Sequence, residues 1–140
     1  MRLLVKSLLN LLPPTLRGAH RQRGQRGERL AAKHLKKQGY RLLARNVRNT
    51  HGELDLIALD PDGRTIVSVE VKAGGANPNY PSELHVTPAK QRRIVALTAQ
   101  LARRHQLTQR HYRFDVIAVE FPEAGEPVSR HHVGAFASQV

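Results

Sequence analysis

The chain contains no cysteine and no tryptophan, and only 4% of its 140 residues are aromatic. The absence of cysteine excludes a disulfide framework, thiolate metal sites and cysteine catalysis, and it fits a reducing cytoplasm. No run of about 18 apolar residues is present, so we expect no transmembrane segment. We therefore expect a cytoplasmic protein. The scarcity of aromatic side chains also argues against stacking on splayed bases and favours backbone recognition of a nucleic acid.

Acidic residues are scarce as well, since 11 Asp and Glu stand against 23 Lys and Arg, for a formal net charge of +12. Such an excess of positive charge points to a polyanionic partner, and to nucleic acid before an anionic membrane. We expect no small-molecule substrate. Hydrophobic residues make up 40% of the chain, which is enough for one packed domain.

The charge is unevenly distributed, because residues 1–27 contain no acid and the first acid in the chain is Glu28. Residues 1–12 mix apolar residues with bases, and Lys6 interrupts the apolar stretch, which argues against a signal peptide. We expect residues 1–23 to form a basic leader, either flexible or a short amphipathic helix. The folded domain is expected to span residues 24–140.

Hydrophobic periodicity and turn signals predict an α/β domain with the order α-β-β-β-α-β, followed by a short last strand. Thr87 supplies a capping hydroxyl and Pro88 the first position of the second helix. The sequence Asp60-Pro61-Asp62-Gly63 is a turn that joins the second and third strands as a hairpin. The expected helices are 25–38 and 88–105, and the expected strands are 40–46, 53–59, 65–73, 112–121 and 128–136.

Two acids lie inside predicted strands, where propensity alone would not place them. Asp55 is in the second strand, and Glu70 is in the third with Lys72 two residues further on the same face. In the expected hairpin Asp55 and Glu70 approach each other across the strands. Two neighbouring carboxylates need a cation, which Lys72 or a divalent metal would supply, and oxygen ligands suit Mg²⁺ or Mn²⁺.

Such a set suits phosphodiester hydrolysis. A metal bound by Asp55 and Glu70 would polarise a phosphate oxygen and lower the pKa of a bound water. Lys72 would position that water or stabilise the developing negative charge.

Other acids have competing interpretations. Glu28 shares a helix face with apolar residues, or it is an acid of the first helical turn that the macrodipole stabilises. For Glu53, two residues before Asp55, we favour a solvated or indirect role. Asp115 is expected to anchor neighbouring backbone or a basic side chain rather than to bind metal.

Basic residues near the start of the second helix oppose the helix macrodipole, which indicates a phosphate partner, although a solvated basic face is the alternative. They are Lys90, Arg92 and Arg93.

Several short motifs, spaced along residues 24–136, resemble the YraN family, bacterial endonuclease-like proteins of the PD-(D/E)XK nuclease superfamily. The central one is Asp55 followed, after 14 residues, by Glu70-Val71-Lys72. The other matching segments are Gly24-x-x-Gly27-Glu28-x-x-Ala31, Gly39-Tyr40, Asn46, Gly52-Glu53-Leu54-Asp55-Leu56-Ile57-Ala58, Val69-Glu70, Thr87-Pro88-Ala89-Lys90-Gln91-Arg92-Arg93-Ile94 and Arg113-Phe114-Asp115-Val116.

The resemblance implies a restriction-endonuclease-like fold with a mixed sheet flanked by helices, similar to archaeal Holliday-junction resolvases. It implies Asp55 and Glu70 as metal ligands, Lys72 as the catalytic lysine, and Glu28 as a contributor from the first helix. The implied activity is Mg²⁺- or Mn²⁺-dependent cleavage of nucleic acid, with structured or branched DNA favoured.

The resemblance also implies a surface that holds the substrate, and chemistry on two DNA strands would favour a homodimer. The nucleic-acid-binding residues that we expect are Lys90, Gln91, Arg92 and Arg93.

Two departures from the family pattern stand out. Members usually carry an arginine shortly after the lysine of Glu-x-Lys, where this chain has Ala73-Gly74-Gly75-Ala76. A contact with substrate phosphate is therefore absent or moved. Ser68 stands where the family tends to have an aromatic residue, which is a change in packing.

Three hypotheses remain open at this point. The first is a metal-dependent endonuclease, and the second is a nuclease fold that binds nucleic acid without cutting it. The third is a small basic protein that docks on an RNA–protein assembly and whose acids are merely paired. The third hypothesis predicts acids on exposed faces, whereas Asp55 and Glu70 fall in strand interiors.

Overall fold

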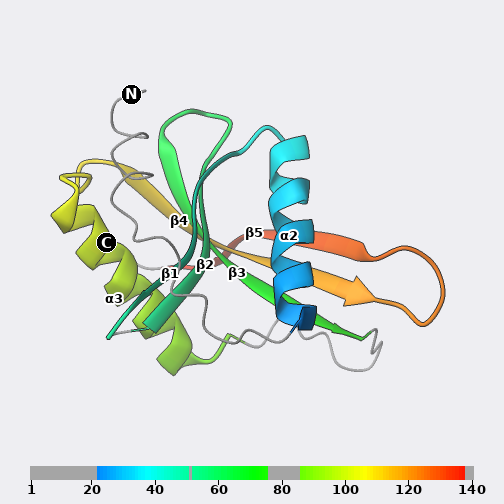
Figure 1. Ribbon diagram of the computed structural model, residues 1–140. Helices are drawn as coiled ribbons and strands as arrows, with labels where there is room; N and C mark the ends of the chain where they lie inside the picture. Colours follow the sequence, from blue (N-terminus) through cyan, green and yellow to red (C-terminus); the bar gives the residue numbers. More distant parts are fainter. Residues whose placement is uncertain (1–21, 51, 76–85, 138–140) are drawn as a thin grey trace.

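Two helices and five strands make up residues 22–50, 52–75 and 86–137, the part of the chain that the computed structural model describes (Figure 1). The predicted α-β-β-β-α-β order with a last strand is confirmed. None of the helices in these ranges is long and apolar enough to cross a membrane. The elements are α2 (Gln22–Lys37), β1 (Arg41–Asn49), β2 (Gly52–Leu59), β3 (Thr65–Gly75), α3 (Pro88–Arg104), β4 (His111–Phe121) and β5 (Val128–Phe136).

The strands form one mixed sheet in the order β1-β2-β3-β4-β5. β3 and β4 are parallel, and the other neighbours are antiparallel. A parallel pair needs a crossover connection, and α3 lies in that connection. The predicted hairpin is confirmed, with Leu56 opposite Val69 and Leu59 opposite Ile66.

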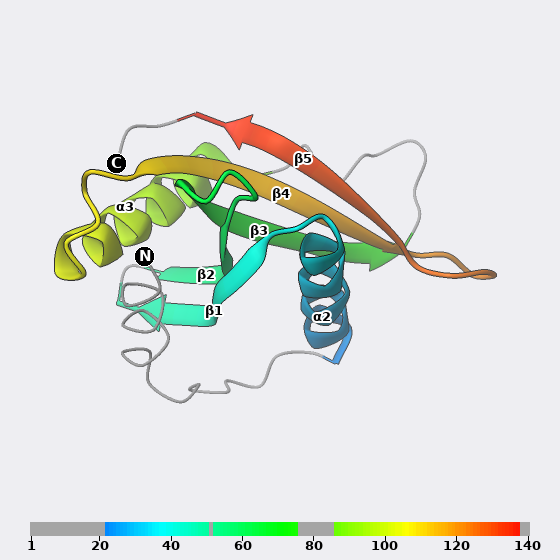
Figure 2. The same cartoon turned by 90° about the horizontal axis from the view of Figure 1, so that it is seen from above.

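Each helix has its own hydrophobic core, and the alternation of β3 shows that the two cores lie on opposite faces of the sheet. Val67 and Val69 pack with Ala31 and Leu35 of α2. Ile66 packs in the other core, with α3. Figures 1 and 2 show the two helices well apart. Successive side chains of a strand point to opposite faces, so Glu70 and Lys72 share the α3 face with Ile66.

Helix α2 begins at Gln22, three residues before the predicted start. The last two residues of the predicted leader 1–23 are thus helical, and residues 1–21 lie outside the described part. Gly24 lies inside the helix rather than before it, since a glycine in a helix costs only about 1 kcal/mol relative to alanine. Glu28 therefore lies in the second turn, and its explanation as an acid of the first turn is wrong.

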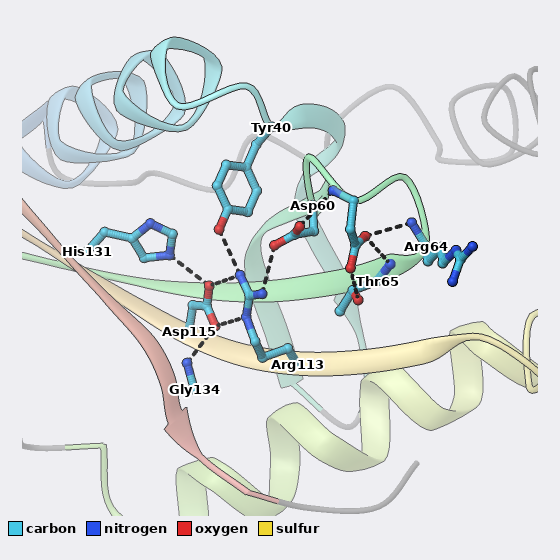
Figure 3. Close-up of polar contacts among 9 residues, drawn as sticks. Tyr40, Asp60, Arg64, Thr65, Arg113, Asp115, His131 and Gly134 are labelled. Carbon is cyan, nitrogen blue, oxygen red and sulfur yellow. Dashed lines mark hydrogen bonds and ion pairs between the residues drawn. The ribbon is translucent and has the colours of Figure 1, made fainter.

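Asp115 is fully buried and anchors β5 to β4 (Figure 3). Its carboxylate accepts hydrogen bonds from Arg113 Nε and Nη2, both at 2.8 Å, and from the Gly134 backbone N–H at 2.9 Å. His131 Nε2 lies 2.7 Å from the same carboxylate. Burial opposes the charge, but the contacts with His131, Arg113 and Gly134 outweigh it and lower the pKa of Asp115. The prediction of an anchoring role is confirmed.

Arg113 extends this network to the start of β1 and to the turn between β2 and β3. Its guanidinium donates to Asp60 at 2.7 Å and to the Tyr40 hydroxyl at 2.8 Å. In the same turn Asp62 accepts from the backbone N–H groups of Thr65 and Arg64, which lowers the pKa of Asp62 to about 2. The predicted turn is thus closed by its own aspartates (Figure 3).

Candidate functional site

The candidate site lies where β2 and β3 separate. Their pairing ends at Leu56 and Val69, and the next residue of β2 toward the opening is Asp55. Its Oδ2 accepts a hydrogen bond of 2.8 Å from the backbone N–H of Val71. The carboxylate thus satisfies a backbone donor that has lost its strand partner. Continuing the register places Asp55 opposite Glu70, as expected.

β2 also changes its orientation at this point. Leu54 packs in the core with α3, whereas Leu56 packs in the core with α2. Residues two apart on a regular strand share one face, so the strand is twisted at Asp55. Across β1, Asn46 lies at the matching position and has a φ of 49°. Asparagine tolerates this left-handed conformation, and the distortion is thus shared by both strands.

The opening lets carboxylates from separate elements meet. Oxygens of Glu28 from α2, and of Glu53 and Asp55 from β2, all lie within 4.8 Å of one another. Burial and the negative charges of Glu70 and Glu28 raise the pKa of Asp55 to about 8, although the Val71 N–H opposes the shift. Glu70 itself is only 5% exposed. This cluster of acids needs a positive charge.

Helix α2 brings Glu28 to the cluster by an unusually close approach to β3. Gly27 faces Ala73, and a Cβ added to Gly27 would lie 2.7 Å from the Ala73 Cβ. The missing Cβ and the small side chain on β3 allow the contact. Ala73 also begins the segment where the family pattern has an arginine, and the structure uses Ala73 for packing.

We expect Gly27→Ala to destabilise the protein by about 1 kcal/mol, because the clash outweighs the better helix propensity of alanine. Urea unfolding measures this change. Gly24→Ala is the matched control, since its added Cβ meets nothing within 4 Å, and it should be neutral or stabilising. Equal effects of the two substitutions would contradict the close approach of α2.

Two lysines stand beside the acids. Lys90, in the first turn of α3, forms an ion pair with Glu70. Burial opposes the charge of Lys90, but the hydrogen bond and the charge of Glu70 prevail and raise its pKa. The pKa of Lys72 is lowered by burial and by the charge of Lys90, against the attraction of Glu70 and Asp55. Both ammonium groups therefore belong to the same site.

A cleft of about 660 Å³ opens beside Glu53, Asp55 and Glu70, whereas Glu28 and Lys72 are not among its lining residues. Arg48, on its wall, donates to Glu53 at 3.1 Å. None of the described residues that line the cleft is aromatic, so the cleft offers charge and hydrogen bonds rather than stacking surfaces. The lining residues are Arg48, Asn49, Thr50, Gly52, Glu53, Asp55, Glu70, Thr87, Lys90, Arg93 and Ile94.

Comparison with known proteins assigns the chain to a family. The model of the uncharacterised protein family UPF0102 matches residues 27–119, which is more than half of the chain. This chain belongs to UPF0102. The resemblance to the YraN family is thereby confirmed. The matched segment runs from Gly27 in α2 to Val119 in β4, and it includes every acid of the site.

Relatives of UPF0102 match over most of their length. A UPF0102 protein of Pelobacter propionicus is 42% identical over 122 residues, covering 87% of each chain. One of Alkalilimnicola ehrlichii is 43% identical, covering 80% of this chain and 88% of its own. One of Geobacter sulfurreducens is 38% identical, covering 88% and 96%.

In this member of UPF0102 the structure brings together most of the predicted site residues. Asp55 and Glu70 lie at the opening, and Glu28 approaches from α2. Lys72 and Lys90 share the electrostatic environment of the two acids. These residues come from α2, β2, β3 and α3, so only the folded chain assembles them.

The predicted nucleic-acid-binding residues of α3 divide into different roles. Arg93 lines the cleft, and Arg92 is exposed. The Gln91 side chain donates a hydrogen bond of 2.9 Å to the Val86 carbonyl, and this bond fixes the residue two positions before the start of α3. Lys90 contacts Glu70 directly, so its first partner is a carboxylate of the site.

The structure places Glu53 nearer to the other acids than its sequence position requires. The sequence favours a solvated or indirect role for Glu53, and its carboxylate lies within 4.8 Å of those of Glu28 and Asp55. The available signal was its position two residues before Asp55, on the same face of the predicted strand.

Proposed function

We propose that the chain is a divalent-metal-dependent endonuclease that hydrolyses phosphodiester bonds of nucleic acid. The observation that supports it best is the position of Asp55. Its carboxylate lies between separated strands, close to Glu28 and Glu53, and the negative charge of Glu70 raises its pKa, in a chain with a net charge of +12. A structural role does not require so many acids in a half-buried site, whereas binding a cation does.

The donor set fits a hard divalent cation. Carboxylate oxygens are the ligands that Mg²⁺ and Mn²⁺ prefer. Asp55 and Glu70 would hold the ion, and the charge of Glu70 is near enough to raise the pKa of Asp55. The acids whose oxygens lie within 4.8 Å of one another are Glu28, Glu53 and Asp55, so Asp55 is the ligand common to both sets and Glu28 and Glu53 are the further oxygen donors. When bound, such an ion supplies charge neutralisation at the phosphate and activation of a water. Lys72 stands on the same face of β3 as Glu70, where its ammonium would stabilise negative charge that develops on the phosphate.

We propose DNA as the favoured substrate, in duplex, structured or branched form. The described lining of the cleft has three bases beside its three acids and no aromatic residue, which suits contact with a phosphate backbone rather than with splayed bases. Cleavage of both strands of a branched DNA would favour a homodimer.

A binding module that does not cut is the second candidate. The ion pair of Lys90 with Glu70 supports it, because an acid already neutralised by lysine has less need of a metal. The two candidates share the cleft and the basic residues, and they differ in whether the acids act on a bound phosphodiester.

The test is cleavage of a substrate panel by the purified protein in Mg²⁺ or Mn²⁺. Duplex, nicked, flapped and four-way DNA are compared with RNA. We expect metal-dependent cleavage of at least one DNA that is lost in Glu70→Gln, while binding survives because the basic residues remain. Binding should weaken steeply with added salt.

The matched control is Glu123→Gln, which removes an exposed acid of the turn between β4 and β5 and should leave cleavage unchanged. Undiminished cleavage by Glu70→Gln would contradict the assigned site. Binding of nucleic acid without cleavage of any substrate would favour the binding module.

A further inference from the structure

Lys90 occupies a position that helix electrostatics disfavours. It lies in the first turn of α3, where Thr87 caps the helix and accepts a hydrogen bond of 3.1 Å from the Lys90 backbone N–H. The positive end of the helix dipole repels an ammonium at this place. Glu70 compensates, because its carboxylate Oε1 receives the Lys90 ammonium. The pair therefore joins the start of α3 to β3 at the centre of the site.

The acids of the cluster differ in how they are neutralised. Glu53 is paired with Arg48, and Glu70 with Lys90. Asp55 receives a backbone N–H and lies against Glu70, whose charge raises its pKa. Without the ammonium of Lys90, the charges of Asp55 and Glu70 would oppose each other with less compensation. Lys90 thus supplies positive charge at the place where a divalent cation would be needed.

A divalent cation and the Lys90 ammonium compete for Glu70. The ammonium contacts one of the Glu70 oxygens directly. A divalent cation on the same carboxylate would lie so near the ammonium that the two positive charges would repel each other strongly in a half-buried site. Lysine has a long flexible stem, so its ammonium can leave the carboxylate without movement of α3. Arg93, three residues further along the helix, lies on the same side and lines the cleft.

We propose that the Lys90 ammonium binds Glu70 in place of the divalent cation and is displaced when the cation binds. Lys90 neutralises Glu70 in the metal-free protein, and it turns to the phosphate backbone of the nucleic acid, beside Arg93, when a cation is bound. The inference rests on the proposed function. It makes metal and nucleic acid promote each other's binding, because each removes the Lys90–Glu70 pair that opposes the other.

The test uses Lys90→Met, which keeps the apolar stem and removes the charge. Calorimetric titration with Mn²⁺ in the absence of nucleic acid should show binding about 5-fold or more tighter than in the wild-type protein. In Ca²⁺, which allows DNA binding to be measured apart from cleavage, DNA affinity of the wild-type protein should rise, and that of Lys90→Met should rise less. Lys90→Gln provides a second neutral variant should the first fold poorly.

Arg103→Met is the matched control, because it removes an exposed positive charge from the last turn of the same helix. Its Mn²⁺ affinity should equal that of the wild-type protein. Suppose that both Lys90 variants bind Mn²⁺ as tightly as the wild-type protein or more weakly, and that the wild-type protein does bind it. This result would overturn the proposed competition between Lys90 and the cation and would leave the proposed function intact. Absence of Mn²⁺ binding in all proteins, with and without DNA, would overturn both.

Discussion

The Asp55→Asn variant is expected to be more stable than the wild-type protein in the absence of metal, by about 2 kcal/mol, and to lose about 1000-fold or more in cleavage rate. Asparagine keeps an oxygen that can accept the hydrogen bond from the Val71 N–H. Asparagine is neutral, whereas at neutral pH Asp55, whose pKa burial and the neighbouring acids raise to about 8, must take up a proton on folding or bury its charge. The same charge is what a divalent cation would require.

Urea unfolding with and without Mn²⁺ measures the first effect. We expect Mn²⁺ to stabilise the wild-type protein and to leave Asp55→Asn almost unchanged, because ligand binding stabilises only the folded state that binds it. Glu123→Gln serves as the control, since it removes an exposed carboxylate outside the cleft and should respond to Mn²⁺ as the wild-type protein does. A destabilised Asp55→Asn that still gained stability from Mn²⁺ would indicate a structural acid.

The Asp115→Ala variant is expected to lose about 3–5 kcal/mol of folding free energy. Removing the buried carboxylate deprives Arg113 and His131 of their shared acceptor and leaves the Gly134 N–H without its partner. Arg113 keeps Asp60, which limits the loss. Urea unfolding at pH 7 measures the difference, and a change below about 1 kcal/mol would contradict the anchoring role.

The pH dependence of unfolding gives an independent measurement. The pKa of Asp115 is lowered by folding from its ordinary value of 3.8, so its stabilising contribution is complete above that pH. The contribution is lost as the pH falls through the lower folded-state pKa. The wild-type protein should therefore lose more stability below pH 3.8 than Asp115→Ala does, and parallel acid profiles would contradict the assignment.

The elements followed closely from local signals. The sequence predicts the last strand at 128–136, and the strand is found at Val128–Phe136. Helix α3 begins at Pro88 after its Thr87 cap, as predicted. The β2–β3 hairpin follows from its turn residues, whose side chains close the turn locally. Helix α2 begins three residues before the predicted start, because a glycine inside a helix costs only about 1 kcal/mol relative to alanine.

The candidate site was predictable only in part. Asp55 and Glu70 stand out because a strand interior disfavours acids, and the hairpin register places them together. The register shows neither that β2 twists at Asp55 nor that Glu28 from α2 meets Glu53 and Asp55 there. Nor does the Glu-x-Lys motif of β3 show that Lys90 from α3 neutralises Glu70.

By itself the sequence determined which residues are available for chemistry. With 11 acids among 140 residues, the few that interrupt apolar strands are conspicuous, and spacing assigns them to neighbouring strands because strand geometry is periodic. The tertiary structure decided which charges meet. α2 approaches β3 only because Gly27 and Ala73 are both small, and that contact sets the place of Glu28. Such distances depend on packing between elements remote in the chain, which no local pattern encodes.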